Sequence, residues 1–188
     1  MDVLIFWDRR APPGLARPVL RCISDITGFS ADIAENPVII GGYMRYRDQV
    51  NACTVLDDLA TFKRLHKIRP PILLVLGHDL FAPGLDFVFG LARPPARVSV
   101  VSGMRLGNEY YGRDKNDEDL IDRVSKEGSH EIGHLFGLGH CDDHECIMYN
   151  PHTLDELDGK TKEFCPSCSG ALLRGKREFD FDNDFGCN

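Results

Sequence analysis

The chain has 188 residues, 43% of them hydrophobic, a length and composition that favour one domain with one substantial apolar core. Its 29 acidic residues outnumber the 22 basic ones, and the formal net charge of -7 opposes the phosphate contacts of nucleic-acid binding. No apolar run reaches the roughly 18 residues of a membrane span. We therefore expect no nucleic-acid partner and no membrane.

The first residues predict a strand and then a helix. Val3–Trp7 is an apolar run, too short for the core of an export signal, which needs about 7 residues or more. Leu15, Val19 and Ile23 then recur at helical spacing until Gly28. Because no export signal is recognised, we expect a reducing, cytoplasmic location, where the seven cysteines favour metal or thiol chemistry over disulfides.

The next segments predict further strands around a second helix. Residues 38–40 could form a short second strand, although residues 43–47 alternate equally well. A helix with Thr54 as its N-cap is expected to end before Pro70. Ile72–Leu76 is a continuous run of leucine and β-branched residues, which is typical of a central strand covered on both faces.

Two apolar segments and a long helix follow. Residues 87–91 and 98–101 are separated by a linker suited to a hairpin, so one of them is expected to be an antiparallel edge strand. Apolar residues at helical spacing from Asp117 predict a long helix that ends at Gly137, a natural left-handed C-terminal cap. These elements predict an α/β (α+β) fold with a mixed sheet.

The remaining third of the chain differs in composition. We divide the single domain into an α/β subdomain at residues 1–138 and a C-terminal subdomain at residues 139–188. Helical and strand periodicity fade in the second part, so we expect metal cross-links to hold it in place of a large apolar core. The acidic tail at residues 178–184 is interleaved with phenylalanines, and the sequence leaves open whether it docks.

One short motif predicts a catalytic metal site. His130 and His134 are four residues apart, which places both imidazoles on the same face of a helix, one turn apart. Gly137 allows the backbone to reverse, so that His140 can supply a third imidazole. Three protein ligands leave one position of a zinc ion open, as catalysis requires. Glu131 is offset by about 100° on the helix, which suits a general base better than a ligand.

Four cysteines predict a second, closed metal site. Cys141 directly follows His140, and Cys146, Cys165 and Cys168 complete the set. Four thiolates form a tetrahedral structural zinc site, which would fix the loop that bears His140. Two disulfides or a redox pair are the alternatives; the first conflicts with a reducing compartment, and the second lacks a thioredoxin-like context.

Cys22, Cys53 and Cys187 remain without an assigned role. The first two fit small apolar core positions, whereas Cys187 lies at a terminus.

With both motifs in place, the chain resembles the archaemetzincins, a branch of the metzincin zinc peptidases. The pattern of cysteine, four residues, cysteine, one residue and methionine appears here from Cys141 to Met148. Sixteen residues separate Met148 from Cys165, one fewer than in the family pattern. The resemblance implies two zinc ions, one catalytic and one structural, and a Met148 that packs beneath the three histidines without binding metal.

The resemblance also implies an architecture and a mode of substrate binding. Metzincins have a twisted mixed sheet with one antiparallel edge strand, and residues 87–91 are the candidate here. An extended peptide could bind along that edge through backbone hydrogen bonds. Tyr149 and His144 lie near the motif and are candidates for support of the transition state.

The sequence thus predicts a monomeric zinc peptidase that acts on peptides or proteins, and it does not distinguish endopeptidase from aminopeptidase action. The alternative is a non-catalytic protein, stabilised by zinc, whose cleft binds a peptide or a protein partner.

Overall fold

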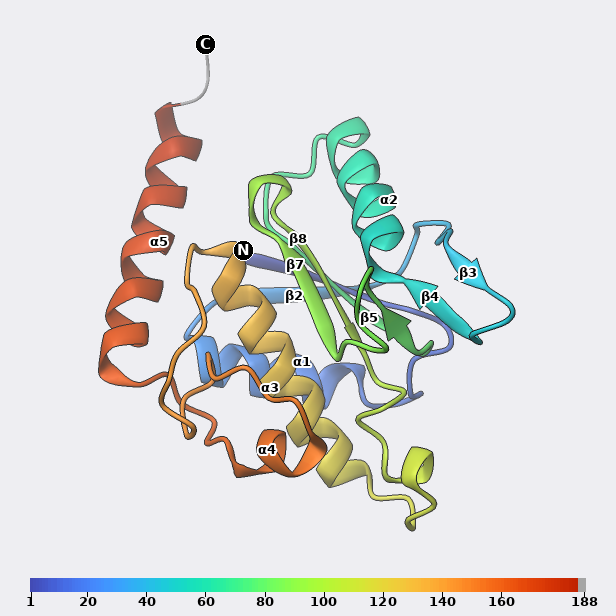
Figure 1. The fold of residues 1–188 in the computed structure, drawn as a ribbon. Coiled ribbons are helices and arrows are strands. Elements are labelled where there is room, and N and C mark those ends of the chain that lie inside the picture. The colour runs from blue at the N-terminus through green and yellow to red at the C-terminus, as the bar shows by residue number, and fades with distance from the viewer. Residues whose placement is uncertain (186–188) are drawn as a thin grey trace.

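A five-stranded sheet forms the centre of the computed structural model, which describes residues 1–185 and the side chains as far as residue 181 (Figure 1). Four strands are parallel, and β7 pairs antiparallel with β8 at one edge, so the mixed sheet with one antiparallel edge strand is confirmed. In spatial order the strands are β2 (Ala31–Glu35), β1 (Val3–Trp7), β5 (Ile72–Leu76), β8 (Val98–Ser102) and β7 (Gly90–Arg93).

The expected second strand at residues 38–40 is wrong. The strand beside β1 is β2, which starts seven residues earlier, and residues 38–40 belong to no strand. Asn36 explains the break, because its side chain bonds both the N–H and the carbonyl oxygen of Val38. The alternative at residues 43–47 is partly right, since a smaller sheet consists of β3 (Tyr43–Met44), β4 (Gln49–Asn51) and β6 (Leu80–Phe81).

Helices cover both faces of the large sheet. In β5, Leu73 and Val75 face α1 and α3, while Ile72, Leu74 and Leu76 face α2, so the central strand is buried on both sides as expected. Figure 1 shows α2 on one side of the sheet and α1 with α3 on the other. The helices are α1 (Ala16–Thr27), α2 (Ala52–Leu65), α3 (Asp117–Leu135), α4 (Leu154–Gly159) and α5 (Pro166–Phe185), with short 3-10 turns at Pro94–Ala96 and Asn108–Tyr111.

The structure differs from the sequence prediction at the start of α2 and at the start of the edge strand. The cap of α2 is Asn51, whose side chain accepts a hydrogen bond from the N–H of Cys53, whereas Thr54 lies inside the helix. The edge strand begins at Gly90 instead of residue 87, although Phe89 still accepts a hydrogen bond from the N–H of Ser102. The predicted antiparallel edge strand is therefore confirmed, but it starts three residues later than predicted.

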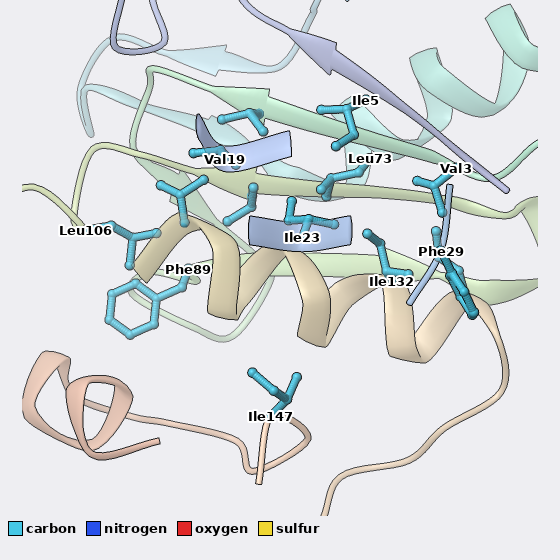
Figure 2. Close-up of a cluster of buried hydrophobic side chains, with 14 of the residues drawn as sticks. Val3, Ile5, Val19, Ile23, Phe29, Leu73, Phe89, Leu106, Ile132 and Ile147 are labelled. Carbon is cyan, nitrogen blue, oxygen red and sulfur yellow. The ribbon is translucent and has the colours of Figure 1, made fainter. Parts of the chain in front are cut away.

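The C-terminal part of the chain shares the main apolar core, which the sequence did not predict. Ile147, Met148 and Leu157 are fully buried, and Leu172 and Phe179 are buried in the same cluster. Figure 2 shows Ile147 on the side of α3 that faces away from the sheet. The motif from His130 to His134 thus lies on a helix enclosed from both sides. Within the described residues, no helix combines the length and hydropathy that a membrane span requires.

Candidate active site and metal centres

The two ends of α3 fix the positions of His130, His134 and His140. Asn116 caps the first turn, where its side-chain oxygen accepts hydrogen bonds from two backbone N–H groups. At the other end, Gly137 takes a left-handed conformation with a φ of 88°, which lets the chain turn back. His130 and His134 project from the last turns of the helix, and His140 follows the reversal.

The three imidazoles converge on one point. Nδ1 of His130 donates to the carbonyl oxygen of Ile147 at 2.9 Å, and Nδ1 of His134 donates to that of Leu138 at 2.8 Å. These bonds leave the Nε2 atoms of His130 and His134 3.0 Å apart. One ring nitrogen from each of these residues and from His140 lies within 4.8 Å of the other two. The sequence prediction that the three rings share one site agrees with this geometry.

The donor set fits a divalent cation. A carbonyl oxygen only accepts hydrogen bonds, so each Nδ1 carries the proton and each facing Nε2 presents a lone pair. Two lone pairs at this distance repel each other unless a cation lies between them, and carbonyl-oriented imidazoles are the usual arrangement at zinc. Burial lowers the pKa of His130 well below its ordinary value and also lowers the pKa of His134 and His140. A lowered pKa favours the neutral imidazole, which is the form that binds a metal ion.

Glu131 lies beside the histidines in a tightly enclosed position. It is 3% exposed, and one carboxylate oxygen, Oε2, is buried without a hydrogen-bond partner among the described residues. A Cβ placed on Gly90 would lie 2.5 Å from its other oxygen, so the backbone of β7 forms one wall of the carboxylate's site. Burial and the neighbouring charge of Glu127 raise the pKa of Glu131 well above its ordinary value, against the opposing effect of Lys160.

A cleft of about 620 Å³ opens over this group. One wall follows the edge strand and the segment before it, and is mostly apolar. The opposite wall comes from α3 and the segments after it. The cleft residues of the second wall are Glu127, His130, Glu131, His134, His140, Asn150, Pro151 and His152. This size suits a short stretch of peptide, because ligand clefts range over roughly 300 to 1,000 Å³.

Met148 packs against α3 in line with the family resemblance. It is fully buried, and a Cβ on Gly133 would collide with its sulfur, so the glycine permits this close approach. His144 and Tyr149, the two candidates for support of the transition state, pack against each other with their ring centroids 4.3 Å apart and their planes tilted by 45°. Neither is among the residues that line the cleft.

The four predicted cysteines form a second cluster. The Sγ atoms of Cys141, Cys146, Cys165 and Cys168 all lie within 4.8 Å of one another, and the described cysteines are free of disulfides. Cys146 accepts backbone N–H groups from Met148 at 3.4 Å and from Cys165 at 3.3 Å, which stabilises a thiolate. Tetrahedral zinc separates its sulfur ligands by about 3.8 Å, so the cluster fits a zinc ion. Cys187 lies outside the described residues.

Sequence reasoning missed several residues at the site. Glu127 precedes Glu131 by four residues, a spacing that places both on one helical face and could have identified it. Gly90, His152 and Lys160 carried no such signal, because they reach the site through the tertiary fold.

Comparisons with known proteins agree with the site. Residues 38–174 match the model of peptidase family M54. The archaemetzincin of Thermococcus kodakarensis is 48% identical over 148 residues, which are 77% of each chain, and that of Methanopyrus kandleri is 42% identical over 70% of each.

Solved structures show the same likeness. A zinc-dependent peptidase from Methanocorpusculum labreanum is 43% identical, with a TM-score of 0.86 over 90% of this chain and 99% of that one. The archaemetzincin of Methanopyrus kandleri superimposes with a TM-score of 0.77 at 33% identity, over 94% and 96% of the two chains. This chain therefore belongs to peptidase family M54, the archaemetzincins, and is a zinc metallopeptidase.

Proposed function

We propose that this peptidase hydrolyses peptide bonds with Glu131 as general base, at a zinc ion held by His130, His134 and His140. The observation that carries the proposal is the convergence of three imidazoles beside a buried carboxylate, in a cleft wide enough for a peptide. A bound zinc ion supplies Lewis acidity, which polarises a carbonyl and makes a water molecule easier to deprotonate.

The edge strand provides a means of holding the substrate. Strand β7 pairs with β8 on one side, and its residues Gly90, Leu91 and Ala92 line the cleft on the other. An extended peptide can add to this edge through backbone hydrogen bonds, which orient its carbonyl without regard to side chain. The mostly apolar wall then offers contacts to the side chains of the peptide.

Glu131 moves the proton. Its carboxylate accepts a proton from the attacking water and delivers it to the departing amine, so one residue serves both steps. Its enclosure between Gly90 and α3 fixes the direction in which the carboxylate points. The four cysteines would hold a second, structural zinc ion without a catalytic part, which would anchor the segment that begins at Cys141, directly after His140.

Replacing Glu131 with glutamine tests the proposed base. We expect Glu131→Gln to lower kcat by roughly 10²- to 10⁴-fold, because the amide cannot accept the proton. Zinc content should not change, since the carboxylate is not a ligand. Glu118→Gln, at an exposed position in the first turn of the same helix, is the matched control and should retain activity.

The assay uses a diverse peptide library, zinc-loaded protein and a chelator control. Full activity in Glu131→Gln would exclude this residue as base. Absence of cleavage by the wild type across the library would favour the non-catalytic binding protein.

A further inference from the structure

A second buried carboxylate adjoins the proposed base. Glu127 lies one helical turn before Glu131 on α3, and the two side chains line the same wall of the cleft. Glu127 is 4% exposed, and its Oε2 atom, like that of Glu131, is buried without a hydrogen-bond partner among the described residues. Two carboxylates at this spacing repel each other when both are ionised, and burial strengthens the repulsion.

Lys160 is the buried cation that faces this pair. Its side chain is fully buried, its Nζ lies 3.9 Å from Oε2 of Glu127, and it interacts electrostatically with both glutamates. The buried Arg123 and Lys126 of α3 each pair with a different carboxylate. Arg123 pairs with Asp158 at 2.6 Å, and Lys126 pairs with Asp122 at 2.8 Å.

The same lysine joins the helix to the segment beneath the histidines. Nζ of Lys160 donates to the carbonyl oxygen of Tyr149 at 3.1 Å. The neighbouring residue, Thr161, donates its N–H to the carbonyl oxygen of Glu145 at 2.8 Å. The segment from Glu145 to Tyr149 contains Ile147, whose carbonyl oxygen orients His130. Lys160 therefore contacts α3 through Glu127 and also contacts the segment whose backbone orients His130.

We infer that Lys160 is a positioning residue for the proposed base. Its ammonium group offsets the like charges of Glu127 and Glu131, so that the Glu131 carboxylate stays aimed into the cleft. Lys160 does not line the cleft, so it acts without touching substrate. The inference rests on the proposed function, because it assigns a role in aligning Glu131.

A double-substitution cycle tests the inference. Lys160→Met keeps the length of the side chain and removes its charge, and Glu127→Gln removes the like charge that the lysine offsets. We expect Lys160→Met alone to lower kcat by about 10- to 100-fold with little change in KM. The combined variant should return to within about twofold of Glu127→Gln, because the charge conflict is gone. Lys162→Met, two residues away at a half-exposed position, is the matched control.

A second readout does not depend on turnover. Acetohydroxamate chelates zinc, and at the proposed site its hydroxyl would take the place of the attacking water, next to Glu131. Its affinity for the zinc-loaded protein, measured by calorimetry, should fall in Lys160→Met and recover in the combined variant, with zinc content unchanged. If Lys160→Met alone does not fold, comparison of Glu127→Gln with the combined variant carries the test.

The outcomes separate this inference from the proposed function. Wild-type kcat and hydroxamate affinity in Lys160→Met would overturn the inference while leaving the peptidase intact. A combined variant as impaired as Lys160→Met, or much slower than Glu127→Gln, would also overturn it, since a purely structural lysine is not rescued by removing a charge. A wild type that cleaves no peptide would instead refute the proposed function, and the hydroxamate affinities would still report on Lys160.

Discussion

Two carbonyl oxygens decide how His130 and His134 present their rings. Ile147 and Leu138 each accept a hydrogen bond from Nδ1, and so both Nε2 lone pairs turn toward the same point. The acceptor Ile147 could not be inferred from the motif, because it reaches His130 from 17 residues away through the turn at Met148. At the residue scale, the motif predicts the candidate ligands, while backbone carbonyl groups orient their rings.

The contact between Gly90 and Glu131 gives a prediction at this scale. In Gly90→Ala the new methyl group would collide with the carboxylate, including two carbon atoms of the side chain within 2.9 Å. Glu131 would have to turn away, so we expect a loss of kcat of about tenfold or more and destabilisation of about 1 to 3 kcal/mol.

Gly103→Ala is the control for this substitution, because a Cβ there meets its nearest neighbour at 3.4 Å, an ordinary contact. Steady-state kinetics and thermal unfolding provide the measurements. Unchanged kcat in Gly90→Ala would show that Glu131 remains effective when its carboxylate points in a different direction.

At the scale of elements, α3 and the segment after it pack together as one unit. The helix packs closely on the sheet, since a Cβ on Gly128 would lie 3.1 Å from Leu73 and 3.0 Å from Ile23. On its other side it meets Met148, which approaches at Gly133. The sequence predicted α3 well, because its apolar periodicity and Gly137 agree. It did not predict α4 and α5, whose periodicity is obscured by charged and cysteine residues.

The cysteine cluster gives a prediction for this unit. Cys141 follows His140 directly, and its N–H donates to the carbonyl oxygen of Met148 at 2.9 Å. We expect Cys165→Ser to lose one of two zinc equivalents, to unfold at a lower temperature and to cleave peptide more slowly, because the cluster anchors the chain next to His140. Cys53→Ser, on α2 and far from the cluster in sequence, should keep both metals.

Elemental analysis and thermal unfolding of the two variants provide the comparison. Retention of both zinc equivalents by Cys165→Ser would contradict the assignment of four thiolate ligands.

At the scale of the whole molecule, strand β2 and the position of Lys160 were not predicted from the sequence. The buried strands β1, β5 and β8 were predicted because their apolar residues are continuous, whereas β2 carries one bulky apolar residue among exposed ones and has no such signal. The histidine cluster was predicted because chain spacing alone brings two of its residues together. The contact of Glu131 with Gly90 and its electrostatic interaction with Lys160 were not predicted, because these residues come from β7 and from the end of α4.

The account depends on one metal ion shared by His130, His134 and His140, with a coordination position free of protein. Crystals of the zinc-loaded protein, with anomalous data collected at the zinc absorption edge, test this most directly. We expect a peak about 2.1 Å from one nitrogen of each imidazole, with no fourth protein ligand. A fourth protein ligand at that peak, or no peak between the three rings in protein that still cleaves peptides, would contradict the account.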